Sequence, residues 1–178
     1  MRIISGSHKG RRLFAPKTLP VRPTTDRSKE ALFNILQHQY DWSSIRVLDL
    51  FSGTGSISYE FASRGVTEVF SVDINSCCIK FIQQTAQKLD LKINTIQGDT
   101  LKYLTSINMD FDLIFADPPY NIDPKSYIKL VNIIFENNKL KKNGLLILEH
   151  SEQKNLEVHP KFSQARKYGS NIFSFFER

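Results

Sequence analysis

Short apolar runs alternate with longer amphipathic segments from Ile45 to Glu149. The apolar runs predict buried strands, and segments with apolar residues three or four positions apart predict helices. The predicted strands are 46–51, 68–73, 92–97, 113–116 and 145–149, and the predicted helices are 57–64, 76–89, a short one from Leu101 and one over about 125–137. This alternation predicts a parallel sheet with helices on both faces.

The N-terminal part of the chain departs from this alternation. Residues 1–23 carry two apolar pairs, Ile3-Ile4 and Leu13-Phe14, separated by a polar segment with glycines, which is typical of a small hairpin arm. Thr24 or Thr25 is suited to cap a helix that we expect to run to about residue 39.

The C-terminal part also differs from the alternating pattern. Residues 164–168 and 172–176 flank a Gly169-Ser170-Asn171 turn, so we expect an antiparallel hairpin to close the sheet. A length of 178 residues suits one domain. We therefore assign residues 1–40 to an arm and a helix within the same domain as residues 41–178.

The chain is basic, with a net charge of +6 and a pI near 9.3, which makes an anionic partner plausible. No acidic residue precedes Asp26, whereas the arm is rich in cations. These are Arg2, Lys9, Arg11, Arg12, Lys17 and Arg22. A basic arm suits contact with phosphates. The alternative is a solvated, floppy terminus.

Cysteine and histidine spacing excludes several kinds of site. Cys77 and Cys78 are adjacent in a predicted helix, so they fit neither a disulfide framework nor a zinc site, and we expect reduced thiols in the cytoplasm. The histidines lack metal-ligand spacing, and we expect surface or half-buried positions for His8, His38, His150 and His159. We expect neither a membrane span nor a signal peptide, because the apolar runs are too short and Met1–Gly6 has no h-region.

The stretch Asp117-Pro118-Pro119-Tyr120 follows the fourth predicted strand directly. The prolines stiffen the corner, at the strand end where open α/β sheets bind their ligands. A carboxylate and a proline carbonyl only accept hydrogen bonds, so side by side they can hold both hydrogens of an NH2 group. Tyr120 offers a ring on which a flat base can stack. The alternative is a Pro-Pro turn with a solvated aspartate.

A glycine loop, Gly53-Thr54-Gly55, follows the first strand and precedes a helix. Glycines there let a ligand approach the backbone, although Ser58 replaces the third glycine of the dinucleotide fingerprint. Asp73 ends the second strand, 24 residues after Asp49, where a carboxylate can accept from ribose hydroxyls. The loop and Asp73 fit NAD or any other adenosine-bearing ligand.

Acidic residues at the strand ends favour one of these ligands. Asp49, Asp73 and Asp99 are expected to line one edge of the sheet together with Asp117, and Asp99 can accept from an adenine amine. Such a rim disfavours a pyrophosphate and favours a cation. We therefore prefer S-adenosylmethionine (SAM), which carries a sulfonium and an ammonium, over NAD. The alternative is that each aspartate merely ends a strand or caps a helix.

Taken in order, these motifs resemble those of class I SAM-dependent methyltransferases that act on amino groups, and the ends of the chain resemble the RsmD family. The resemblance covers essentially the whole chain. It rests on Asp49–Gly55, Asp73, Gly98-Asp99, Asp117–Tyr120, Arg2-Ile3-Ile4, Gly6, Lys9–Leu13, Arg22–Arg27, Glu30–Leu36, Tyr168-Gly169 and Ser174–Phe176. The chain departs from the family pattern at Ser58, Asn75, Thr85, His150 and Ser151.

The resemblance implies a Rossmann-like α/β fold with a seven-stranded, mostly parallel sheet, a closing antiparallel C-terminal hairpin and a basic N-terminal hairpin arm and helix. The implied activity is methyl transfer from SAM to the exocyclic N2 amine of a specific guanine in 16S ribosomal RNA. The implied partner is the assembled or assembling small ribosomal subunit. We expect a cytoplasmic monomer that uses no metal and no membrane.

The resemblance also implies roles for individual residues. The catalytic residues would be Asp117, Pro118, Pro119 and Tyr120. The cofactor-binding residues would be Arg22, Pro23, Thr24, Asp49, Phe51, Gly53, Gly55, Asp73, Ile74, Asp99 and Asp117. The RNA-binding residues would be Arg2, Lys9, Arg11, Arg12 and Arg27.

Four other functions fit part of the pattern. A DNA adenine-N6 or cytosine-N4 methyltransferase would use the same acceptor corner, formed by the Asp117 carboxylate and the Pro118 carbonyl, but we expect no separate target-recognition domain within these 178 residues. A protein-glutamine methyltransferase usually carries Asn where this chain has Asp117. An NAD-dependent reductase would leave Asp117–Tyr120 unexplained, and a non-catalytic RNA-binding module would not need four acids at the rim.

Overall fold

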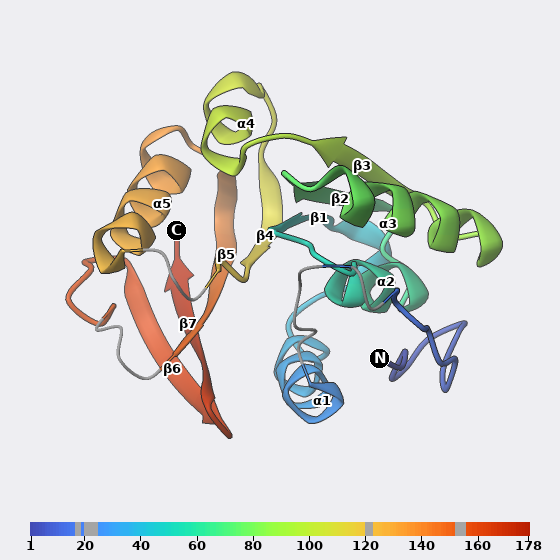
Figure 1. Cartoon of the computed structure of the whole chain (residues 1–178). Helices are drawn as coiled ribbons and strands as arrows, with labels where there is room; N and C mark the ends of the chain where they lie inside the picture. The colour runs from blue at the N-terminus through green and yellow to red at the C-terminus, as the bar shows by residue number, and fades with distance from the viewer. Residues whose placement is uncertain (17–18, 20–24, 120–122, 152–155) are drawn as a thin grey trace.

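A computed structural model of the chain describes residues 1–16, 19, 25–119, 123–151 and 156–178. Its centre is a seven-stranded sheet in the order β3-β2-β1-β4-β5-β7-β6 (Figure 1). The strands are β1 Arg46–Leu50, β2 Glu68–Asp73, β3 Ile93–Gln97, β4 Phe111–Ala116, β5 Leu140–Ser151, β6 Phe162–Tyr168 and β7 Asn171–Glu177. The helices are α1 Asp26–Leu36, the 3-10 turn η1 Trp42–Ser44, α2 Ser56–Ser63, α3 Ser76–Lys88, α4 Thr100–Ser106 and α5 Pro124–Glu136.

The pairing of the strands confirms the predicted fold class. Strands β1 to β5 pair in parallel, and β7 pairs antiparallel with both β5 and β6. The β6–β7 pair is the closing hairpin expected from the turn at Gly169-Ser170-Asn171. Strand β5 is longer than predicted, because it extends along β4 on one side and β7 on the other. Cys77 and Cys78 are free, as expected.

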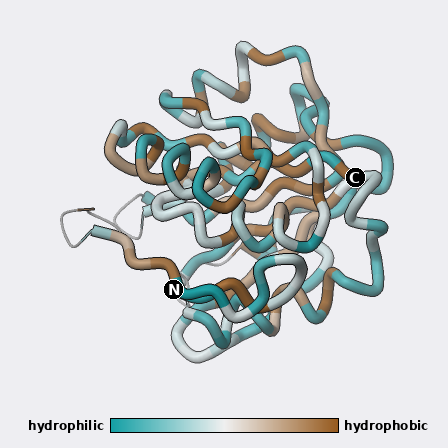
Figure 2. Tube along the Cα trace, turned by 90° about the vertical axis from the view of Figure 1, so that its right-hand side faces the viewer, coloured by the Kyte–Doolittle hydropathy of each residue, from teal (hydrophilic) through white to brown (hydrophobic). Residues whose placement is uncertain are grey.

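Each strand contributes side chains to two hydrophobic clusters, one on each face of the sheet. Val47, Leu113 and Ile147 face the cluster that includes α1 and α2, whereas Leu48 and Ile114 face the cluster that includes α4 and α5. Figure 2 shows the hydrophobic residues concentrated along the central strands. Among the residues that the structure describes, no helix combines the length and apolarity needed to cross a membrane.

Helix α1 is capped by Thr25, whose hydroxyl accepts from the Ser28 backbone N–H at 3.1 Å. The helix ends at Leu36, so the prediction that it continues to about residue 39 is wrong. Tyr40 does pack on the core, but it reaches the core from beyond the turn that follows the helix. In the sequence, the position of Tyr40 therefore fits the spacing of one more helical turn, although the residue lies outside the helix.

Residues 1–13 of the N-terminal arm form a hairpin, as predicted, and hydrogen bonds hold it against the rest of the fold. Ile3 N–H donates to the Arg11 carbonyl at 2.9 Å, and Gly10 N–H donates to the Ile3 carbonyl at 2.9 Å. Gly6 adopts φ +83° so close to α2 that a Cβ atom would lie 1.8 Å from the Ser63 carbonyl oxygen. Only glycine fits both this backbone conformation and this contact.

Candidate functional site

The four predicted acids do lie along one edge of the sheet. Asp49 is next to the last residue of β1, Asp73 ends β2, and Asp117 follows β4. Asp99 follows β3 and caps α4 by accepting from the Lys102 backbone N–H at 2.9 Å. Because β1 to β4 are parallel, these carboxyl ends share one edge of the sheet.

Asp73 fixes the glycine loop. One carboxylate oxygen accepts from the Gly53 backbone N–H, and the other accepts from the Asn75 backbone N–H, each at 2.8 Å. Gly53 and Gly55 adopt positive φ angles of 53° and 77°. A Cβ atom on Gly55 would lie 2.8 Å from Ile82 Cγ1, so the loop can follow this path only with glycine there.

Asp49 is a buried acid that accepts hydrogen bonds from Ser58, the residue that stands in place of the third glycine. Ser58 donates to Asp49 Oδ2 from its hydroxyl at 2.5 Å and from its backbone N–H at 3.2 Å. Burial is the largest of the effects that together raise the pKa of Asp49 to about 7; the Ser58 hydrogen bonds lower it, and nearby Asp73 adds a smaller increase. Ser58 thus supplies a buried polar contact that glycine could not.

Asp117 is partly buried beyond the end of β4. Its pKa is well above the usual range, first because of burial and then because Glu149 and Asp49 lie nearby. Pro118 is buried and Pro119 is exposed. Tyr120 lies outside the described residues, as do Arg22, Pro23 and Thr24.

Glu149 is a further candidate site residue, which no short sequence motif marks. Ala116 pairs with Leu148, so the next residues, Asp117 just after β4 and Glu149 within β5, lie side by side on the same face of the sheet. Glu149 is 1% exposed, and the Asn171 side-chain amide donates to its Oε1. The available signal was its position at the end of the fifth predicted strand, because each of the other acids lies at or near the carboxyl end of another predicted strand.

The remaining predicted site residues are exposed or close to the loop. Ile74 follows Asp73 and is 70% exposed, and Phe51 lies at the start of the loop with φ 58°. A positive φ is rare for an aromatic residue, so the chain bends sharply there. The predicted RNA-binding residues all have exposed side chains, namely Arg2, Lys9, Arg11, Arg12 and Arg27.

A buried ion pair between Lys29 of α1 and Glu60 of α2 also anchors the N-terminal arm. Lys29 Nζ donates to the Arg2 carbonyl at 2.6 Å and to Ser56 Oγ at 3.1 Å, and it lies 3.8 Å from Glu60 Oε2. Glu60 also accepts from the backbone N–H groups of Ile4 at 2.7 Å and Ser5 at 3.0 Å. Burial lowers the pKa of Lys29, and Glu60 opposes this shift.

This pair was not predicted, although α1 contained a signal for it. Lys29 lies three and four positions before Leu32 and Phe33, on the apolar face of the helix. Its side chain and that of Glu60 are 1% and 0% exposed. A lysine on that face needs a buried partner.

His150 corrects a second expectation. The sequence predicts a surface or half-buried position, but the residue is 2% exposed. Its Nε2 lies 2.7 Å from Ser174 Oγ, and its Nδ1 lies 2.8 Å from the Ser151 carbonyl oxygen. Strand β7 covers this side of β5, which the local sequence around residue 150 could not show.

The model of a family described as "Conserved hypothetical protein 95" matches residues 1–177. A ribosomal RNA small subunit methyltransferase D of Buchnera aphidicola subsp. Baizongia pistaciae is 30% identical over 161 residues, which are 90% of this chain and 81% of the relative.

Solved structures share the fold. A hypothetical protein of Thermus thermophilus superimposes with a TM-score of 0.85 at 23% identity, over 100% of this chain and 99% of the other. A protein named SMU.776, solved in complex with S-adenosylhomocysteine (SAH), has a TM-score of 0.64 at 18% identity, over 83% of this chain and 49% of its own. At these identities the likeness concerns the fold.

Proposed function

Because the chain belongs to the family described as "Conserved hypothetical protein 95", the RsmD family of rRNA methyltransferases, we propose that it methylates the exocyclic N2 of a guanine in small-subunit rRNA. The methyl donor is SAM. The observation that carries the proposal is the corner after β4. There the Asp117 carboxyl group lies beside a buried proline, and none of the described residues donates a hydrogen bond to it.

The acceptor corner suits a weak amine nucleophile. The N2 lone pair of guanine is delocalised into the ring, so the nitrogen must be positioned and its developing charge stabilised. Asp117 and the Pro118 carbonyl accept the two N–H groups, which aims the nitrogen at the methyl carbon and stabilises the positive charge that grows on it. SAM supplies a methyl group already activated by a sulfonium. The surplus proton on N2 then passes to Asp117 or to water, and Tyr120 stacks on the base.

Glu149 supports guanine over adenine as the base. Guanine presents two neighbouring donor groups, N1–H and the N2 amine, whereas adenine presents an acceptor nitrogen beside its N6 amine. The carboxyl groups of Asp117, just after β4, and Glu149, in the adjacent strand β5, offer acceptors side by side. Asp117 would therefore take the N2 edge while Glu149 faces N1–H.

The rim of acids fits the positive charges of SAM. Asp49 and Asp117 both have raised pKa values, and a nearby cation would offset the cost of their ionisation. Asp73 and the glycine loop suit the adenosine portion, with Asp99 and Ile74 beside the base. The family resemblance adds Arg22, Pro23 and Thr24 near the methionine portion.

We expect the affinity for SAM to rise roughly tenfold between pH 5.5 and pH 7, because Asp49 has a pKa of about 7. Below that pH the group is mostly neutral, and above it the carboxylate attracts the cation. The amino group of the cofactor stays protonated across this range. Isothermal titration calorimetry at several pH values measures the profile. For an Asp49→Asn variant, the affinity for SAM should change less with pH. If the affinity of wild type changed as little, Asp49 would not be the carboxylate that attracts the cofactor cation.

Transfer of a tritiated methyl group from SAM tests the proposed function directly. The acceptors are unmethylated small ribosomal subunits, naked 16S rRNA and duplex DNA, each with and without enzyme. Label in rRNA, free or in subunits, supports the proposal, and the comparison of the two shows which form is the substrate. Label only in DNA would favour the DNA methyltransferase alternative, and no label in any acceptor would contradict the proposal.

A further inference from the structure

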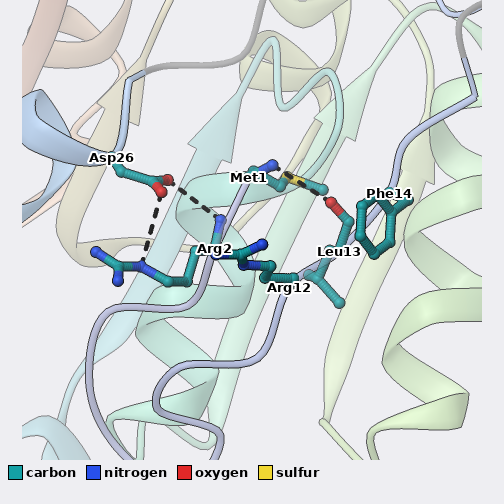
Figure 3. Close-up of a pocket in the computed structure, with 6 residues that line it drawn as sticks. All are labelled: Met1, Arg2, Arg12, Leu13, Phe14 and Asp26. Carbon is teal, nitrogen blue, oxygen red and sulfur yellow. Dashed lines mark hydrogen bonds and ion pairs between the residues drawn. The ribbon is translucent and has the colours of Figure 1, made fainter.

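The N-terminal arm forms a pocket that the proposed chemistry does not use. Its volume is about 290 Å³, and Met1, Arg2, Arg12, Leu13, Phe14 and Asp26 line it. Figure 3 shows the Phe14 ring at one side of the pocket and the Asp26 carboxylate, with the Arg2 guanidinium turned toward it, at the other. The aromatic ring of Phe14, two arginine side chains and the Asp26 carboxylate thus line the same small pocket.

Backbone contacts hold the walls of the pocket in place. Leu13 N–H donates to the Met1 carbonyl at 3.0 Å, and Arg2 pairs with Arg12 in an antiparallel bridge. Asp26 accepts from the Arg2 backbone N–H at 3.1 Å, and its other oxygen lies 3.8 Å from Arg2 Nε. The pocket therefore exists before any ligand binds, which lowers the entropic cost of binding.

The pocket is close to the glycine loop. Lys29 Nζ bonds both the Arg2 carbonyl and Ser56 Oγ, and Ser56 is the first residue of α2, directly after the loop. Arg2 therefore lies beside the edge of the sheet that carries Asp49 and Asp73.

The exposed groups match a nucleotide. Phe14 is 83% exposed, and an exposed aromatic face on a basic surface suits stacking of an unpaired base. The Arg12 guanidinium has no hydrogen-bond or ion-pair partner among the described residues, so it can contact a phosphate. Asp26 can accept from an amino group at the base edge.

We propose that this pocket, with Phe14 as its stacking plate, binds one unpaired nucleotide of single-stranded RNA close to the target. The inference rests on the proposed function, because it takes rRNA as the strand. Stacking tolerates any base, so the Phe14 ring positions the strand without selecting a base. Phosphate contact by Arg12 then fixes the direction in which the strand leaves the pocket.

Two kinds of variant separate stacking from charge. We expect Phe14→Ala to weaken binding of a 2-aminopurine-labelled single-stranded RNA about tenfold, with an unchanged salt slope. Phe14→Trp should restore affinity. Arg12→Gln should instead reduce the salt slope by roughly one unit. Fluorescence titrations at several salt concentrations measure all three effects.

Val158→Ala is the matched control, because Val158 is a similarly exposed apolar residue, 73% exposed, that does not line the pocket. It should bind like wild type. Thermal unfolding of Phe14→Ala should also match wild type, since the ring is solvent-exposed. Phe14→Ala binding within twofold of wild type, or weakened binding with a changed salt slope, would overturn the stacking role.

A failure of the subsite is distinguishable from a failure of the proposed function. The binding titrations contain no SAM, and methyl transfer by wild type is measured separately. Wild-type methylation of rRNA together with normal RNA binding by Phe14→Ala would reject the subsite alone. Loss of binding in Phe14→Ala without any wild-type methylation would leave the subsite standing and reject the methyl transfer.

Discussion

Replacing Asp117 with alanine is expected to lower the single-turnover rate of methyl transfer by about 10² to 10³, with little change in affinity for SAH. The reason is that Asp117 holds the amine and stabilises the charge that appears on it only as the methyl group moves. Interactions made only in the transition state affect the rate and leave ground-state binding intact. Rapid-quench transfer assays and calorimetry with SAH measure the two quantities separately.

Asp110 offers a matched control on the same segment of chain. It directly precedes β4, at the end of the strand opposite Asp117, and its side chain is 49% exposed beside Arg46. Asp110→Ala should therefore keep wild-type transfer rates. Wild-type turnover by Asp117→Ala would refute the acceptor corner, and an equal loss of SAH affinity would assign Asp117 to cofactor binding alone.

Glu60→Ala is expected to destabilise the fold by about 3 to 5 kcal/mol. The change leaves the buried Lys29 ammonium without its carboxylate and removes the acceptor of the Ile4 and Ser5 N–H groups. For a chain of this size such a loss lowers the melting temperature by roughly 10 °C. Urea unfolding followed by circular dichroism measures the free energy of unfolding.

Glu68 is the control for this second effect. It pairs with Arg46 at 3.1 Å but is 50% exposed, so Glu68→Ala should cost about 1 kcal/mol or less. Removing both charges, with Lys29→Met and Glu60→Gln together, should recover part of the loss seen in Glu60→Ala. A Glu60→Ala free energy of unfolding equal to that of Glu68→Ala would mean that the buried pair does not anchor the arm.

The sheet could be predicted from the sequence because buried parallel strands are continuous apolar runs. Strand β4, for example, is marked by Leu113–Ala116 and ended by Asp117-Pro118. The end of α1 could not be predicted, since Tyr40 continues the helical spacing although it lies after the turn that follows the helix. Local periodicity does not reveal from which element a side chain reaches the core.

The acids of the site were predictable because each lies at or near the carboxyl end of a predicted strand. Glu149 shares this position, but it belongs to no short motif and was overlooked. The Lys29–Glu60 pair depends on contact between α1 and α2, so only tertiary structure brings the two charges together. Ser58 departs from a glycine pattern in the sequence, and its hydrogen bonds to Asp49 become visible only in the fold.

The measurement that tests the central claim most directly is the identity of the methylated nucleoside. Ribosomal RNA from the transfer reaction is digested to nucleosides and separated by liquid chromatography with mass spectrometry. The geometry of Asp117, Pro118 and Glu149 predicts N2-methylguanosine, made by wild type and lost in Asp117→Ala. N6-methyladenosine, N4-methylcytidine or 1-methylguanosine as the product would contradict it.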